Sequence, residues 1–288
     1  MFLKSPILLA AALAALLVGC AFDPNTVATD PELQTAIDNS PALAEDGMAD
    51  GSASVLSDPA PVYTGWARTN WAVSAASKEK SSADSSAGTV TLKITRTISG
   101  TLVIASNWNA FLSNGFLTNK TFTMEKVRYA TFTKLAGKCR HTALSYAVAK
   151  SSNATVGLTQ VRVFSSTNGT TPLVTVSASD MTNLYDTNTI QGLADRHWIR
   201  VEVTATADSG VTPLVYLHQG LWRVIMHDDG VHGGDTVAGD KVYSAYLRIG
   251  AAAFKHVHLD ALDAATLNNL TNVANYSSVI WSPVFRSL

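Results

Sequence analysis

The side chains best suited to chemistry lie in an acidic, glycine-rich segment over residues 228–243. Asp228, Asp229, Asp235 and Asp240 fall within thirteen residues, with four glycines among them. Glycine allows positive φ angles, so the backbone can turn its carbonyl groups toward a common centre. Ca²⁺ binds about six to eight oxygens, which carboxylates and carbonyls supply together. The segment therefore predicts a Ca²⁺ site formed by these four aspartates, because their charges would otherwise repel one another.

A metal-free loop is the alternative for the same residues. Aspartate and glycine are common in turns, where the carboxylate accepts hydrogen bonds from nearby backbone N–H groups. The sequence leaves both alternatives open. It places Tyr243 in the core of the following strand rather than at the site.

The spacing of these residues resembles that of a known module. Residues 228–230 (DDG), Asp235, residues 238–240 (AGD) and Tyr243 follow the pattern DDG…D..AGD..Y. The segment is similar to loops of exported bacterial immunoglobulin-like modules, including choice-of-anchor X domains. This resemblance implies an immunoglobulin-like sandwich over about 156–262. The chain differs by an extra glycine at 233–234 and by Lys241, which stands where those modules usually carry glycine.

Two histidines form a second candidate. His256 and His258, followed by Asp260, share one face of an expected strand and could begin a zinc site, to which His218 and His227 could add ligands. The alternative is a structural role. The sequence contains no G-x-S-x-G, H-E-x-x-H or phosphate-binding glycine motif. We therefore expect no enzymatic activity, and a metal-dependent hydrolase is the least favoured hypothesis.

The composition predicts β structure. Charged residues make up 15% of the chain, below the usual quarter, and Thr, Ser and Val are abundant, which favours strands. Short apolar runs separated by Gly, Asn, Ser and Asp predict an all-β antiparallel β-sandwich. Residues 89–106 are expected to form two strands joined near Ser99-Gly100. One helix is expected over Asp260 to Asn269.

The folded region is expected to contain two domains. Residues 63–155 would form a strand-rich basic domain, and residues 156–288 an immunoglobulin-like sandwich with the acidic loop and a C-terminal tail. The boundary is placed near 149–156, where the charge balance changes. One large sandwich is the alternative.

Basic and aromatic residues alternate along the first domain. The basic residues could bind anionic lipid, acidic polysaccharide or nucleic acid. We favour the alternative that they form the solvated face of a strand with the aromatics turned inward, and we expect no nucleic-acid partner. Cys139 is expected to be a buried apolar residue rather than a reactive thiol. The cluster comprises Lys120, Lys126, Arg128, Lys134, Lys138 and Arg140, with Phe122, Tyr129 and Phe132 between them.

The first nineteen residues are typical of an export signal. Lys4 precedes an apolar run from Ile7 to Val18 that is too short to span a bilayer. Gly19-Cys20 ends the run and resembles the lipobox of bacterial lipoproteins. That resemblance implies removal of residues 1–19 and attachment of acyl chains such as palmitate to Cys20. Ala21 replaces the aspartate that signals inner-membrane retention, so the outer membrane is expected. An ordinary secretory signal is the alternative.

Residues 20–62 are expected to form the lipidated cysteine and a flexible acidic tether. Between Lys4 and Arg68 the chain has eight acidic residues and no Lys or Arg, too polar a composition to order itself. We therefore predict a surface-anchored lipoprotein of the cell envelope that acts in adhesion, scaffolding or binding of an envelope protein or glycan. The alternative is a carbohydrate-binding module, with Trp108 exposed for sugar stacking and Trp198 and Trp222 in the core.

Overall fold

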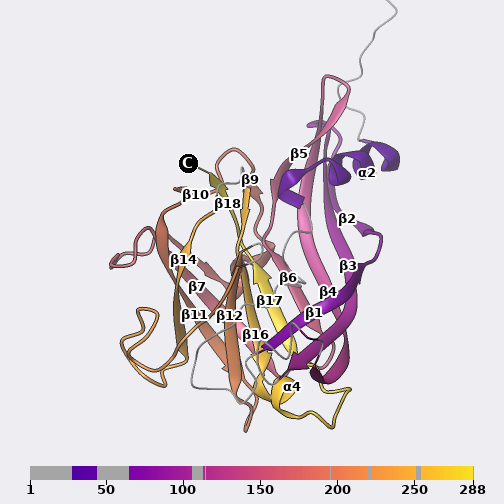
Figure 1. Ribbon diagram of the computed structural model, residues 1–288. Coiled ribbons are helices and arrows are strands. Elements are labelled where there is room, and N and C mark those ends of the chain that lie inside the picture. The colour runs from indigo at the N-terminus through magenta and orange to yellow at the C-terminus, as the bar shows by residue number, and fades with distance from the viewer. Residues whose placement is uncertain are drawn as a thin grey trace, which may run out of the picture.

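The computed structural model describes residues 28–43, 65–105, 113, 115–194, 196–219, 222–250 and 254–287. Within these residues strands predominate and helices are few and short, which confirms the predicted all-β class (Figure 1). Among the described strands every pairing is antiparallel except the short one between β10 (Gly192–Leu193) and β18 (Val284–Ser287). The predicted signal peptide (residues 1–19), Cys20 and Trp108 lie outside the described residues.

An eleven-stranded sheet forms the frame of the molecule. Its hydrogen-bonded order is β1-β3-β4-β6-β17-β16-β12-β13, with β2 on β3, β5 on β4 and β9 on β5. The strands are β1 (Gly65–Val73), β2 (Ser77–Asp84), β3 (Thr89–Ala105), β4 (Phe116–Leu135), β5 (Lys138–Leu144), β6 (Ala147–Ser151), β9 (Tyr185–Asp186), β12 (Pro213–Gln219), β13 (Trp222–Ile225), β16 (His258–Asp263) and β17 (Ser278–Ser282).

Two smaller sheets complete the fold. The four-stranded sheet has the order β14-β11-β7-β8 and the three-stranded sheet the order β10-β18-β15. Their strands not yet given are β7 (Val156–Phe164), β8 (Val174–Ser177), β11 (Trp198–Ala207), β14 (Val242–Arg248) and β15 (Phe254–His256), and the helices are α2 (Asp30–Asp38), η1 (Pro41–Leu43), η2 (Ala178–Thr182) and α4 (Ala264–Asn268).

The four-stranded sheet packs on one face of the main sheet to form the sandwich. Val201 and Val203 of β11 share a core with Leu217 of β12 and Leu259 of β16. All six residues of β16 are buried, because the opposite face of this strand is covered as well. A strand buried on both faces has no reason to alternate polar and apolar residues.

The main sheet curls around a second core on that opposite face. Leu102 of β3 and Phe122 of β4 pack there with Tyr216 of β12 and Ile280 of β17. The two ends of the sheet approach each other, since Arg223 of β13 donates to the carbonyl of Trp66 in β1 at 2.9 Å.

The main sheet crosses the predicted domain boundary near 149–156. Ala149 of β6 lies opposite Ile280 of β17 in register, and β6 also pairs with β4. Strands from both predicted domains therefore belong to one hydrogen-bonded sheet.

Residues 89–105 form one long strand, not the two strands expected. Gly100 lies within β3 beside a register shift in β1. A Cβ at Gly100 would lie 2.9 Å from the carbonyl oxygen of Thr69. The glycine therefore allows a close approach of β1 rather than a turn.

Residues 30–43, expected to be part of a flexible tether, are folded. Thr29 and Glu32 form a capping box at the start of α2. Leu33 and Ile37 are buried against Leu92 and Phe132 of the long hairpin. Although the segment is acidic, burial of these apolar side chains offsets the conformational entropy that is lost when it becomes ordered.

The helix expected over Asp260 to Asn269 is shorter than predicted. Its first residues continue β16, and α4 begins only at Ala264. Asp263 caps this helix by accepting a hydrogen bond from the Ala265 amide at 2.9 Å. None of the helices in the described part of the chain is long and apolar enough to cross a membrane.

Three basic residues of β4 contradict both interpretations of the basic cluster, as a binding surface and as a solvated face. Lys120, Lys126 and Arg128 are buried and lie on the same face as Phe122 and Phe132. They are therefore neither a binding surface nor a solvated face. Lys120 donates to the backbone carbonyl of Asn269 at 2.7 Å, and Arg128 donates to that of Ala42 at 2.8 Å.

Candidate functional site

The acidic loop is fixed to the start of β14. His227 and Ser244 exchange backbone hydrogen bonds of 2.9 and 2.8 Å. Gly233 has a φ of +63°, and a Cβ there would lie 2.3 Å from the Ser244 carbonyl oxygen. The position therefore requires glycine, and the extra glycine of the sequence serves this close backbone crossing.

Three of the four predicted calcium ligands come together. Carboxylate oxygens of Asp228, Asp235 and Asp240 lie within 4.8 Å of one another. Burial raises the pKa of Asp228, and the charges of Asp240 and Asp235 raise it further. The spacing and the mutual repulsion of these groups are compatible with a bound cation.

Backbone amides already satisfy these carboxylates. Asp228 accepts from the N–H groups of Gly239, Asp240 and Lys241 at 2.8 to 3.1 Å. Asp235 accepts from Gly230 at 2.6 Å. These bonds correspond to the metal-free alternative that the sequence left open, so calcium binding stays a prediction.

Asp229 belongs to a different group. Its Oδ1 accepts from the amides of Val231 and His232, at 2.9 and 2.8 Å. Its Oδ2 lies 2.6 Å from His232 Nδ1 and 3.6 Å from His227 Nδ1. The sequence places His227 with the candidate zinc ligands around His256 and His258 and gives no signal for His232.

The expected zinc pair does not gain further ligands. His256 and His258 are buried with their rings stacked, the centroids 6.2 Å apart. His258 Nδ1 lies 2.6 Å from Ser282 Oγ. Neither residue belongs to a group of three potential metal ligands among the described residues.

His218 and Asp260 are instead part of a buried polar network. Arg68 NH1 lies 2.6 Å from Asp260 Oδ2, and His218 Nε2 lies 3.6 Å from the same oxygen. Arg68 also donates to Tyr276 at 2.8 Å, and Ser278 donates to Asp260 at 2.7 Å. Arg68 and Asp260 lie 192 residues apart in sequence, so no local pattern joins them.

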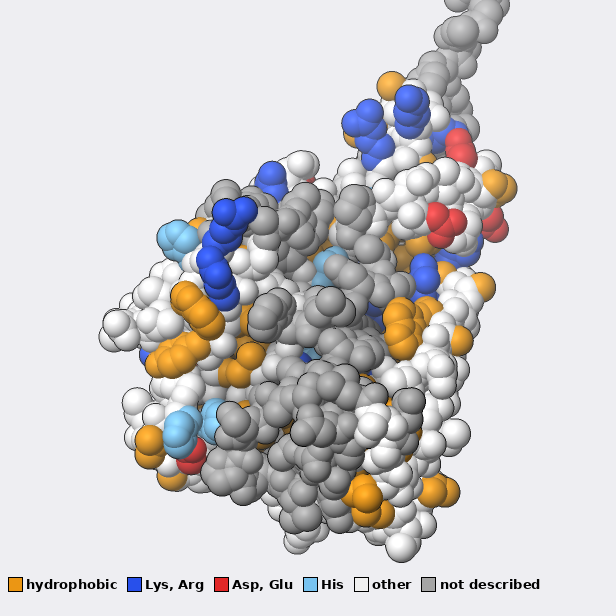
Figure 2. Space-filling model, viewed as in Figure 1, with side chains coloured by type: hydrophobic (Ala, Val, Ile, Leu, Met, Phe, Trp, Pro, Cys, Tyr) orange, Lys and Arg blue, Asp and Glu red, His pale blue; other side chains and the backbone are white. Residues whose placement is uncertain are grey.

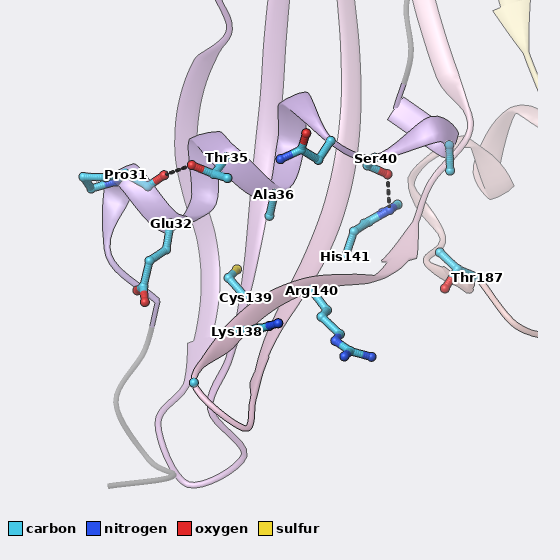
Figure 3. Close-up of a pocket in the computed structure, with 13 residues that line it drawn as sticks. Pro31, Glu32, Thr35, Ala36, Ser40, Lys138, Cys139, Arg140, His141 and Thr187 are labelled. Atoms are coloured by element: carbon cyan, nitrogen blue, oxygen red, sulfur yellow. Dashed lines mark hydrogen bonds between the residues drawn. The ribbon is translucent and has the colours of Figure 1, made fainter. Parts of the chain in front are cut away.

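A groove of about 700 Å³ lies between α2 and β5 (Figure 3). Cys139 and His141 point toward α2, and Ser40 points toward His141. Lys138 and Arg140 line the groove and are exposed. On the other side Glu32 forms an ion pair with Lys134 at 3.1 Å. Figure 2 shows blue and red side chains gathered in this region of the molecule.

Two of the titratable side chains that line the groove, His141 and Cys139, are neutral at neutral pH. Burial lowers the pKa of His141 to about 4, so its imidazole is uncharged at neutral pH. Its Nε2 donates to the carbonyl of Ala143, and its Nδ1 accepts from Ser40 at 2.9 Å. Burial raises the pKa of the half-buried Cys139 thiol, with the Glu32 charge adding to the effect. A protonated thiol is a poor nucleophile.

The exposure of one tryptophan differs from expectation. Trp198, expected in the core, is 55% exposed, because alternation along β11 points Ile199, Val201 and Val203 inward instead. Trp71 is also exposed. The side chain of Trp222 lies outside the described part of the structure.

No family model, no curated protein and no solved structure matches this chain.

Proposed function

We propose that the mature chain is a non-enzymatic lipoprotein of the outer membrane whose folded body binds an envelope protein or glycan. The groove between α2 and β5 carries the proposal, because it is open and has Lys138 and Arg140 at its edge. Cationic side chains at the edge of an open groove suit a partner that bears carboxylate or phosphate groups.

The position of the groove in the chain supports this role. Only nine residues separate Cys20 from Asp30, where α2 begins, and they reach at most about 35 Å when fully extended. A lipid on Cys20 would therefore hold the groove close to the membrane surface. An envelope polymer or a neighbouring membrane protein would lie within its reach.

The anchor is tested by mass spectrometry of the native chain and by Cys20→Ser. We expect an acylated Cys20 as the first residue and release of the Cys20→Ser variant into the soluble fraction. A free thiol at residue 20 in the mature protein would refute the anchor.

The groove is tested by co-sedimentation of the full mature chain with purified envelope fractions. Lys138→Glu combined with Arg140→Glu should weaken binding at least tenfold, because both cations at the rim are reversed. Lys150→Glu combined with Arg248→Glu is the matched control, since it changes the net charge equally at exposed residues of other strands. Equal binding by both double variants would exclude the groove.

Calcium is proposed as a stabilising ion of the acidic loop. Binding to the folded state alone raises the unfolding temperature by mass action. We therefore expect a higher unfolding temperature in Ca²⁺ than in chelator, and loss of that difference in Asp235→Ala combined with Asp240→Ala. Identical melting in Ca²⁺ and chelator would establish the metal-free loop.

A carbohydrate-binding module is the second candidate, favoured by the exposure of Trp198. An exposed indole can stack on the apolar face of a sugar ring. A glycan array should then show binding that Trp198→Ala abolishes and Trp71→Ala leaves intact. Failure to bind any glycan would remove this candidate.

A further inference from the structure

We propose that His227, Asp229 and His232 form a binding site for zinc or a similar borderline transition-metal ion. One ligand atom from each residue lies within 4.8 Å of the others. All three belong to the segment between β13 and β14, and the site is separate from the groove and from the group formed by Asp228, Asp235 and Asp240.

The loop orients the three side chains before any ion binds. The backbone bridge between His227 and Ser244 fixes the main chain of His227 relative to β14. Two amides hold Asp229 Oδ1, which leaves Oδ2 directed at the rings of His227 and His232. The two ring centroids are 5.2 Å apart.

The spacing suits tetrahedral zinc. Ligands about 2.0–2.1 Å from Zn²⁺ lie roughly 3.3 Å from each other in a tetrahedron. His227 Nδ1 lies 3.6 Å from Asp229 Oδ2, and His232 Nδ1 lies 2.6 Å from it. The His227 distance is already close to this value, and a small rotation of the exposed His232 ring would lengthen the His232 distance toward it.

The ligand types select the ion. Two imidazoles and one carboxylate favour borderline ions such as Zn²⁺ over Ca²⁺, which prefers oxygen alone. Zn²⁺ would take the place of the hydrogen between His232 Nδ1 and Asp229 Oδ2, and the neutral imidazole would then carry its proton on Nε2. Three protein ligands leave a fourth position for water or for a donor from a partner.

An ion can reach the site from solvent. The side chain of His232 is 65% exposed, that of Asp229 42% and that of His227 21%. Figure 2 shows pale-blue imidazole groups beside a red carboxylate at the lower left of the surface. The competing explanation is a structural hydrogen bond between Asp229 and His232 with no role for His227.

The test is zinc binding by the full mature chain, followed by calorimetry and by equilibrium dialysis with metal analysis. We expect one equivalent of Zn²⁺ to bind and a tenfold excess of Ca²⁺ not to displace it. His232→Ala should weaken binding at least tenfold. Its side chain is exposed, so the variant should fold, which circular dichroism checks.

Two control variants separate this site from other ligands. His197→Ala removes another exposed histidine, and Asp240→Asn alters the predicted calcium set, and both should bind zinc as the unaltered chain does. Co²⁺ should give visible absorption bands that His227→Ala and His232→Ala both change. No saturable zinc binding, or equal binding by His232→Ala, would overturn the proposal. A change in the Co²⁺ bands with His232→Ala alone would overturn the three-residue site, because His227 would then not be a ligand.

Discussion

Arg68 and Asp260 form an ion pair in the interior of the protein. Both side chains are almost completely buried. Burial alone would raise the pKa of Asp260, but the Arg68 charge and the contact with His218 hold it well below its ordinary range. The same pairing raises the pKa of Arg68 although burial opposes it. The pair is therefore ionised in the folded state.

Replacing Asp260 by Asn should destabilise the fold by about 3–5 kcal/mol, because Arg68 would remain buried without a counter-charge. Chemical unfolding measures this loss. The lowered pKa of Asp260 stabilises the fold above the pKa of the unfolded chain, near 4, and this contribution is lost as the pH falls below it. Asp260→Asn should lack this acid-dependent component, whereas the exposed Asp208→Asn should retain it. An unchanged acid profile in Asp260→Asn would contradict the assignment.

His141 predicts a second dependence on pH. Its folded-state pKa of about 4 lies below the ordinary value near 6.5, so folding favours the neutral imidazole. The contribution of His141 to the free energy of unfolding should be fully present above pH 6.5, and it should fall by about 3 kcal/mol as the pH drops toward 4. Unfolding measured across this range should show the decrease, and His141→Gln should show a flatter profile. Equal profiles would place the titration elsewhere.

At the scale of elements, α2 depends on tertiary contacts for its stability. Nine residues are too few for a stable isolated helix. Leu33 and Ile37 pack on the hairpin of β3 and β4, and Lys134 holds Glu32. The groove beside α2 therefore exists only while the helix is packed on the sheet.

Leu33→Ala should detach α2 from the sheet, since a buried Leu truncated to Ala costs about 2–5 kcal/mol. Hydrogen exchange should show loss of protection in residues 30–38 with little change in β16. Thr35→Ala is the control, because its side chain is exposed on the same helix. Unchanged protection in Leu33→Ala would show that α2 does not depend on this contact.

At the scale of the whole molecule, the main sheet curls until its two end strands meet. Arg223 of β13 is buried, donates to the carbonyl of Trp66 and lies 3.8 Å from the Trp66 ring centroid. Trp66 also packs edge-on against Tyr216 of β12. These contacts join the ends of the sheet around the second core.

Arg223→Met should weaken this closure by about 3 kcal/mol, since it removes a hydrogen bond and a cation–π contact. Urea unfolding measures the loss, and altered tryptophan fluorescence should accompany it. Arg162→Met, at a partly exposed ion pair with Glu202, should change stability by less than about 1 kcal/mol. Equal effects of the two substitutions would contradict a role for Arg223 in closure.

Residue types and their spacing were enough to predict the all-β class, the turn character of the acidic loop and the two-residue period of β4. These are local properties, set by residue types and their spacing. It could not predict which face of β4 is buried, because Lys120 and Arg128 find their acceptors at Asn269 and Ala42, far away in the chain.

The grouping of the charged residues depends on contacts between parts of the chain that are distant in sequence. Asp229 lies beside two histidines rather than beside the other aspartates, because the bridge from His227 to Ser244 brings the loop back onto β14. Arg68 pairs with Asp260 because the sheet curls and brings β1 over β16. Charged side chains interact with the groups that lie nearest to them in space. The amino-acid sequence indicates these distances only for residues that are close together in the chain.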